Sequence, residues 1–283
     1  MRAPLRPSEL DGPGFHRVTV VEESESTNSE LVAAVRAEPD AWPAPSALVA
    51  EHQTAGRGRV GRSWATPPRA SLTVSVLLRP AVPPERLGWL PLIAGTAVVR
   101  AVARTLSRHG GDPVQLAVKW PNDVLVRATT PVAGLGGYRK VAGILAEVVP
   151  EGTAGTDAAV VLGIGLNVSQ TQDELPVETA SSLALAGHPD LDRTALLTAL
   201  LGEVADAVER WEQADGDPVA SGLADECAAV SATLGTRVRA QLAGGAGAVE
   251  GEALRLDATG ALVIRTDAGH ERTVSAGDVH HLR

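Results

Sequence analysis

The chain has 283 residues, of which 44% are hydrophobic, and a formal net charge of −9. Its single cysteine, Cys227, excludes an internal disulfide and a cysteine-rich zinc site, and its apolar neighbours predict a buried side chain. No apolar run reaches the ~18 residues of a membrane helix and no apolar signal region opens the chain, so we expect a cytoplasmic protein.

Strand and helix signals alternate through the first half of the chain. Residues 1–14 contain three prolines and predict a loose tail. Strands are predicted at 15–23, 46–51 and 72–76, the last from alternation of apolar and polar residues. Residues 27–30 (TNSE) fit a capping box that opens a helix, and residues 84–107 predict a long apolar helix.

The central part of the chain predicts further buried strands. A strand at 115–120 ends at a Pro-Asn-Asp turn and resumes at 124–126, and residues 127–139 predict a Gly/Thr/Pro loop. Near-continuous apolar runs predict buried strands at 141–149 and 158–168. Apolar residues at helical spacing predict a helix over 193–211.

The pattern changes near residue 232. Short strand candidates at 235–242, 249–256, 261–266 and 271–275 are separated by glycine turns, which is typical of a small SH3-like β-barrel. We therefore expect a tail over 1–14, a large domain over 15–230 and a small C-terminal domain over 231–283.

The most informative motif is GRGRVGRSW at residues 56–64. Three glycines permit close approach of the backbone to a ligand, and three arginines supply donors that fit phosphate and carboxylate. A basic surface loop or a nucleic-acid patch would have the same composition. Because the chain as a whole is acidic, a small anionic ligand suits this basic island better than a long polyanion.

Four further motifs are each open to a structural and a functional interpretation. KWPND (119–123) ends a strand with a lysine that suits phosphate and an Asn-Asp pair that suits hydrated Mg²⁺ or a base edge, or forms an Asx turn beside a solvated lysine. KVAGILAE (140–147) opens a buried strand with a lysine that binds a ligand or snorkels to solvent. The glycines of GIGLN (163–167) indicate a bulge or a close ligand approach, and ESTN (25–28) indicates a helix cap whose donors can also face a ligand.

Taken in order, these five motifs resemble those of the biotin protein ligases, and the resemblance runs from about Glu25 to Asn167. It implies an α+β fold: a mixed β-sheet flanked by helices, like class II synthetases and lipoate ligases, with a small C-terminal SH3-like β-barrel. The implied enzyme joins biotin to ATP as biotinyl-5′-AMP and transfers biotin to a lysine of a carrier protein. Cationic side chains and Mg²⁺ suit this chemistry because two anions must meet, and a closing loop would shield the adenylate from water.

The resemblance also implies roles for individual residues. The implied catalytic groups are Lys140, Arg57 and Lys119. The implied biotin contacts are Ser26, Thr27, Asn28, Gln53, Arg57, Gly58, Arg59, Lys140, Gly143, Leu145, Gly163 and Gly165. The implied ATP or adenylate contacts are Arg59, Arg62, Trp64, Lys119, Asn122, Asp123 and Asn167. Trp64 would stack on adenine, and Mg²⁺ would lie near Asp123, although no residue is assigned as a metal ligand.

Two alternatives remain open. A lipoate-protein ligase or octanoyltransferase would use the same fold with a different acid, and a regulator could respond to biotinyl-AMP. Only about 24 residues precede ESTN, so we expect a ligase-only enzyme without a DNA-binding domain. The expected partner is the biotin carboxyl carrier protein domain of a biotin-dependent carboxylase. We expect no specific DNA partner, no membrane partner, and a monomer or weak homodimer.

Overall fold

The larger sheet is mixed, as predicted. The computed structural model describes residues 2–10, 14–108, 110–149, 158–242 and 247–282. A seven-stranded sheet has the order β1-β2-β3-β7-β6-β5-β4. Its strands are β1 (Arg17–Ser24), β2 (Ser46–Gln53), β3 (Ser71–Leu78), β4 (Leu116–Lys119), β5 (Asp123–Val132), β6 (Gly136–Val149) and β7 (Ala159–Asn167). Strands β1 and β2 are parallel, and every other neighbouring pair is antiparallel.

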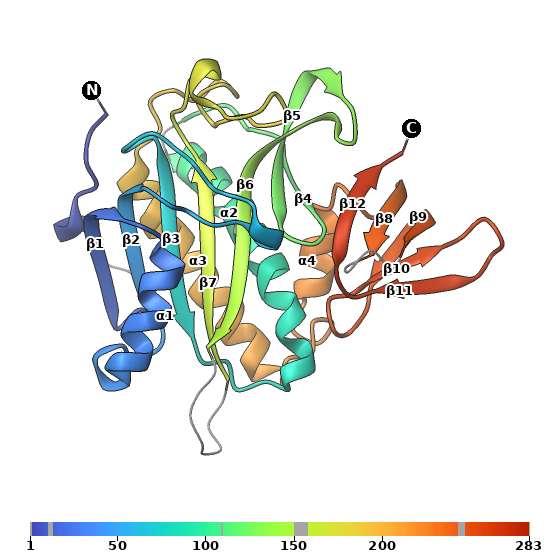
Figure 1. Ribbon diagram of the computed structural model, residues 1–283, viewed down its shortest axis with the longest axis horizontal. Helices are drawn as coiled ribbons and strands as arrows, with labels where there is room; N and C mark the ends of the chain where they lie inside the picture. Colours follow the sequence, from blue (N-terminus) through green and yellow to red (C-terminus); the bar gives the residue numbers. More distant parts are fainter. Residues whose placement is uncertain (1, 11–13, 109, 150–157, 243–246, 283) are drawn as a thin grey trace.

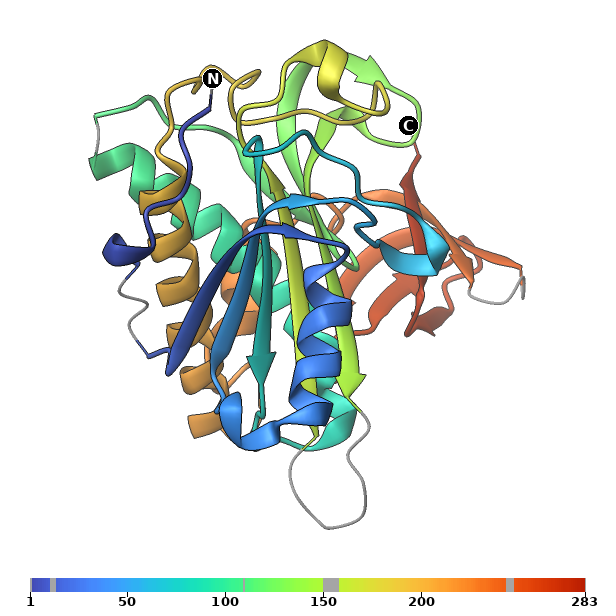
Figure 2. The same cartoon turned by 60° about the vertical axis from the view of Figure 1, so that its left-hand side comes forward.

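Helices cover both faces of this sheet. Helix α1 (Thr27–Ala37) packs on β2, β3 and β7, and helices α2 (Leu90–Arg108) and α3 (Arg193–Gln213) lie on the opposite face (Figures 1 and 2). The Ser26 side chain caps α1 by accepting from Ser29 N, and Asp192 caps α3 in the same way. These caps explain why both helices begin where the sequence predicts.

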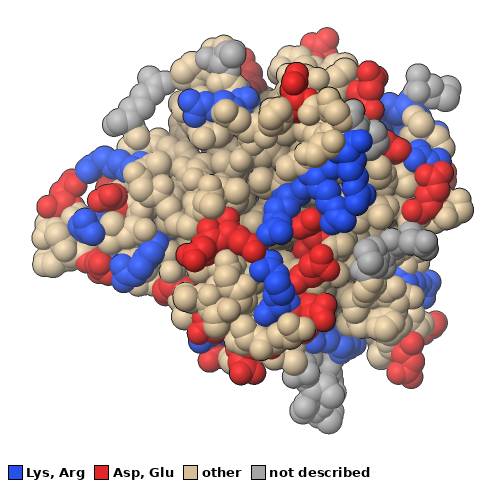
Figure 3. Space-filling view, turned by 180° about the vertical axis from the view of Figure 1, so that it is seen from behind, with Lys and Arg blue, Asp and Glu red and all other residues tan. Residues whose placement is uncertain are grey.

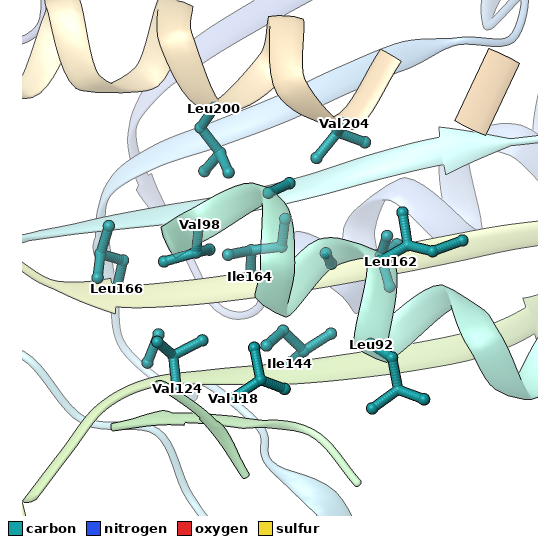
Figure 4. Close-up of a cluster of buried hydrophobic side chains, with 14 of the residues drawn as sticks. Leu92, Val98, Val118, Val124, Ile144, Leu162, Ile164, Leu166, Leu200 and Val204 are labelled. Carbon is teal, nitrogen blue, oxygen red and sulfur yellow. The ribbon is translucent and has the colours of Figure 1, made fainter. Parts of the chain in front are cut away.

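The main core lies between the sheet and the pair α2–α3. Figure 4 shows side chains of α2 and α3 interdigitating with those of β4 to β7. Among the described residues, the segment Pro84–Arg108 is the one helix long and apolar enough to cross a membrane by length and composition. Here it lies largely buried, with Leu90, Leu92 and Ile93 at most 2% exposed. The apolar side chains of this segment therefore form part of the main core.

A second, smaller sheet follows. Its five strands have the order β11-β10-β9-β8-β12 and all pair antiparallel. They are β8 (Arg237–Leu242), β9 (Ala248–Leu256), β10 (Leu262–Arg265), β11 (Glu271–Val274) and β12 (Gly277–His281). Strands β8 to β11 agree with the four predicted from the sequence, whereas β12 and the short helix α4 (Leu223–Ala229) were not predicted. Residues 243–246 and 283 lie outside the described part of the chain.

Tryptophan side chains join the two sheets. The indole Nε1 of Trp89 donates to Asp257 O at 3.2 Å, and that of Trp120 donates to Gly260 O at 2.9 Å. Both indoles are almost fully buried. Because each ring combines a large apolar surface with one donor, it can fill the junction and still satisfy its polar atom. This contact brings β12 next to the end of β4 (Figure 1).

The predicted loop at 127–139 is wrong. Strands β5 and β6 continue through it and meet at a tight turn over residues 133–135. Gly134 in this turn and Gly136 directly after it have φ values of +77° and +58°. Pro131 is tolerated in β5 because β4 pairs only with residues 123–126 and leaves that side of the hairpin without a neighbour.

The N-terminal segment differs from the predicted loose tail. Leu5 and Leu10 belong to the main core, with 5% and 9% of their surfaces exposed. Between them, Pro7–Glu9 forms a 3-10 turn, a conformation that tolerates proline at its first position. Residues 1 and 11–13 of the expected tail lie outside the described part of the chain.

Charged side chains on the helical face pair with one another. Arg100 contacts Glu203 at 2.9 Å and Glu226 at 2.8 Å, and Arg210 contacts Glu226 at 2.8 Å. On the face opposite that of Figure 1, basic and acidic side chains lie next to each other (Figure 3). Cys227, nearby on α4, is buried as predicted, and this burial raises the pKa of its thiol to about 11.

Candidate active site

A cleft of about 760 Å³ crosses the upper part of the larger sheet. The structure brings all the sequence-predicted site residues together in its lining. They are Ser26, Thr27, Asn28, Gln53, Arg57, Gly58, Arg59, Arg62, Trp64, Lys119, Asn122, Asp123, Lys140, Gly143, Leu145, Gly163, Gly165 and Asn167. They come from α1, the ends of β2 and β4, the loop after β2, and β5, β6 and β7.

Side chains at the start of α1 form a rigid polar wall. Thr27 donates to Gln53 Oε1 from both its N (2.8 Å) and its Oγ1 (3.0 Å). Asn28, only 4% exposed, accepts from Ser75 Oγ at 2.6 Å and donates from Nδ2 to Glu147 Oε2 at 2.8 Å. Because these partners fix both amides, the wall presents donors and acceptors in set directions.

Glycines form the floor of the cleft. Gly143 of β6 pairs with Gly165 of β7 across the sheet. A Cβ atom at Gly143 would lie 3.2 Å from Trp64 Cζ3, and one at Gly165 would lie 2.5 Å from Trp64 Cε2. Gly143 and Gly165 therefore make room for the Trp64 indole. The indole Nε1 is buried without a hydrogen-bond partner among the described residues, and the Lys140 Nζ lies 5.8 Å from the ring centroid.

The cations of the cleft are held by acidic or amide partners from several elements. Lys140 Nζ lies 2.5 Å from Asp123 Oδ1, Arg57 contacts Glu147 at 2.7 Å, and Arg62 pairs with Asp278. Arg59 donates to Asn122 Oδ1 at 2.8 Å. An anionic ligand would compete with these partners for the same donors.

Lys119 is the most buried cation of the cleft. Its side chain is 8% exposed, and this burial lowers the pKa of its amine, while the Asp123 carboxylate acts in the opposite direction. His281 of β12 is also partly buried. Desolvation, with a smaller contribution from the Lys119 charge, lowers the pKa of its imidazole to about 4. His281 is therefore neutral near pH 7.

Sequence reasoning missed three parts of the lining. The first is β12, which contributes Asp278, Val279 and His280. The second is the hairpin tip at 133–135, where Gly134 O accepts from His281 N at 3.2 Å. The third is the loop after β7, which contributes Pro176, Val177, Thr179 and Ala180. None of these segments carries a motif. The fold brings them to the cleft from distant parts of the chain, and for this reason the sequence alone did not indicate them.

Among the described residues, no group of three or more His, Cys, Asp or Glu side chains is placed to hold a metal ion. The carboxylate of Asp123 and the amide of Asn122 are the oxygen-bearing groups of the KWPND turn in the cleft. Mg²⁺ commonly binds through one or two carboxylates plus substrate phosphates and waters. This turn suits an ion that arrives with a phosphate ligand better than an ion held by protein alone.

Comparison with known proteins identifies the family. Residues 21–167 match the model of the biotin/lipoate A/B protein ligase family, and residues 233–282 match that of the biotin protein ligase C-terminal domain. The chain belongs to this family and is a ligase.

Relatives of known name are consistent with that assignment. The chain is 41% identical over 273 residues to the biotin–[acetyl-CoA-carboxylase] ligase of Mycobacterium tuberculosis, covering 96% of this chain and 91% of that protein. The biotin protein ligase of Aquifex aeolicus in complex with biotin and ATP is 26% identical, with a TM-score of 0.71 over 95% of this chain and 100% of that one. The Leishmania major ligase with biotinyl-5-AMP is 25% identical, with a TM-score of 0.55 over 92% and 99%.

Proposed function

We propose that this ligase activates biotin with ATP as biotinyl-5′-AMP and then transfers biotin to a lysine of a biotin carboxyl carrier protein domain. The observation that carries the proposal is the single cleft in which a polar wall and a row of cations share one glycine floor. Biotin combines a polar ring, an apolar chain and a carboxylate. The cleft offers a matching group for each of these parts.

The polar wall would bind the biotin ring. Ser26, Thr27, Asn28 and Gln53 present hydroxyl and amide groups that can both donate and accept. The apolar chain would then lie over the floor formed by Gly143, Leu145, Gly163 and Gly165, once the Trp64 indole has moved off Gly143 and Gly165. This direction leads the carboxylate toward Lys140, Arg57, Gly58 and Arg59.

In the first step, the biotin carboxylate attacks the α-phosphorus of ATP. A carboxyl–phosphate bond forms, the bond to the β-phosphate oxygen breaks, and pyrophosphate leaves. Lys140, Arg57 and Lys119 would stabilise the negative charge that builds up on the phosphate oxygens. Lys140 must exchange its Asp123 partner for phosphate to do so.

The remaining predicted groups would hold the nucleotide. Arg59, Arg62, Lys119, Asn122, Asp123 and Asn167 lie along the cation side of the cleft, and Trp64 offers a ring for adenine. Mg²⁺ would be held by Asp123 together with ATP phosphates, and it would neutralise phosphate charge there. The oxygen donors of the KWPND turn suit this ion.

In the second step, the neutral amine of the carrier lysine attacks the carboxyl carbon of biotinyl-AMP. An amide bond forms, the bond from that carbon to the phosphate oxygen breaks, and AMP leaves.

We assign residues 15–230 to the catalytic domain and residues 231–283 to the C-terminal domain. We also propose a cytoplasmic monomer or weak homodimer, with no specific DNA or membrane partner.

The direct test is incubation with ATP, Mg²⁺ and labelled biotin, followed by separation of biotinyl-AMP and pyrophosphate. A carrier domain added afterwards should take up the label on one lysine. Lipoate and octanoate run in parallel address the alternative acids. Adenylation of lipoate in preference to biotin would overturn the proposal.

A further inference from the structure

The N-terminal segment contacts the loop that follows β7. Arg2 donates from Nε to Ser169 Oγ and from NH2 to Ser169 O, both at 2.9 Å, and from NH1 to Glu174 Oε1 at 3.1 Å. The Arg2 guanidinium, assisted by the backbone N–H of Thr171, lowers the pKa of the Glu174 carboxyl to about 2. Glu174 is therefore ionised at neutral pH, and the pair joins two segments far apart in sequence.

The same segment is anchored deeply behind Arg2. Ala3 O accepts from Arg193 NH2 at 2.7 Å, and Leu5 N donates to Glu51. Arg193 and Glu51 form a buried ion pair at 2.8 Å, with side chains 8% and 3% exposed. A buried pair with this many backbone contacts holds its partners in one geometry.

A further ion pair fixes the segment to the start of α3. Arg6 contacts Asp192 at 2.7 Å. The segment thus runs along α3 toward the loop after β7 (Figure 2). Arg2 is held at one end of a fixed stretch of chain.

The far side of that loop reaches the candidate active site. Lys140 N donates to Thr179 O, and Ser181 N donates to Lys140 O, both at 2.8 Å. Asn167 Nδ2 donates to Ser181 O at 2.9 Å. Pro176, Val177, Thr179 and Ala180 of this loop also line the cleft. The loop therefore contacts Arg2 on one side and the Lys140 backbone on the other.

We propose that residues 2–5 form a strap that positions the loop 169–182 against Lys140, with Arg2 as its positioning residue. The proposal rests on the proposed function, in which Lys140 contacts the reacting phosphate. Without the Arg2 contacts, the loop would sample other positions, and the Lys140 backbone would lose part of its support. The rate of adenylation would fall without loss of the biotin-ring contacts, which lie on α1 and β2.

The test compares Arg2→Ala with Arg6→Ala, a matched variant that removes the ion pair to α3 while the buried contacts of Ala3 and Leu5 still hold the segment in place. Adenylation is measured in single turnovers at saturating ATP, together with the KM for biotin. We expect Arg2→Ala to slow biotinyl-AMP formation about fivefold, as for a partly exposed ion pair, with the biotin KM changed less than about twofold. Arg6→Ala should keep the wild-type rate, and Arg2→Lys should recover part of it.

Hydrogen exchange supplies a readout that needs no substrate. In Arg2→Ala, the amides of Lys140 and Ser181 should exchange faster than in wild type, and in Arg6→Ala they should not. Unchanged exchange in Arg2→Ala would overturn the strap, as would equal loss of rate in both alanine variants. If wild type forms no biotinyl-AMP, the proposed function fails, whereas the exchange result still decides whether the loop is positioned by Arg2.

Discussion

Gly163→Ala tests the link between the glycine floor and the polar wall. Gly163 has no left-handed backbone angle, so alanine adds no backbone strain there. Its Cβ would, however, lie 2.9 Å from Asn28 Cγ and 3.1 Å from Asn28 Nδ2, and closer still to Oδ1. Since Asn28 belongs to a helix start that is itself packed, the amide must turn out of its place.

The magnitude follows from the hydrogen bonds that this turn would break. Asn28 accepts from Ser75 Oγ and donates to Leu145 O and Glu147 Oε2. A net ~0.5–1.5 kcal/mol for each bond gives a loss of about 2–4 kcal/mol in the free energy of unfolding. If Asn28 also binds the biotin ring, the KM for biotin should rise by tenfold or more, and the KM for ATP should change little.

The assay is urea unfolding of three variants: Gly163→Ala, Asn28→Ala and the double variant that carries both changes. Asn28→Ala removes the side chain with which the new methyl group collides. The double variant should therefore be no less stable than Asn28→Ala alone, which is strongly non-additive. Additive losses, or a Gly163→Ala enzyme with wild-type stability and biotin KM, would refute the reasoning.

Three further predictions concern single groups. Lys140→Ala should fold normally but raise the activation free energy of adenylation by about 2–4 kcal/mol, and a wild-type rate of biotinyl-AMP formation would contradict its role. The loop 56–64 carries Val60, which is 82% exposed at φ +54°, so protease cleavage there should slow when biotin is added; equal cleavage rates would count against ordering. The Glu174 pKa of about 2 is below its unfolded value, so this carboxylate stabilises the fold above about pH 4.5 and loses that effect as pH falls toward 2. Wild type should accordingly lose more stability than Glu174→Gln over that interval in acid titrations followed by circular dichroism.

The motif-bearing half of the candidate site could be predicted because its geometry is local. Lys119 and Asp123 flank one tight turn, and Gly143 and Gly165 meet because β6 and β7 are neighbours in the sheet. KWPND, KVAGILAE and GIGLN lie at the end of a strand or within one, so forming the sheet brings their cleft-facing residues together. Local sequence patterns were therefore enough to single out these motifs, and the resemblance to the biotin protein ligases supplied the roles of their residues.

The missed segments depend on contacts that spacing does not encode. The hairpin over 127–139 has a Gly/Thr/Pro composition typical of a loop, and its strand structure follows from pairing with residues of β6. The sequence predicts that Arg2 and Leu5 belong to a loose tail, because their partners Glu174 and Glu51 are distant in sequence and become neighbours only in the fold. Strand β12 is short and needs β8 as a neighbour to form. In each case tertiary pairing overrides a local signal.

The pairing of the cations with carboxylates explains how one acidic protein keeps so many like charges in one cleft. Arg57, Arg62 and Lys140 would repel one another there. Their partners Glu147, Asp278 and Asp123 come from β6, β12 and the start of β5. Cancelling the charge therefore also ties the arginine loop to β6 and β12, and ties Lys140 to β5. Glu147 in addition accepts from Asn28 in the polar wall. A ligand that takes over Arg57 therefore releases a carboxylate which also holds the wall, and the two halves of the cleft respond to one another through this side chain.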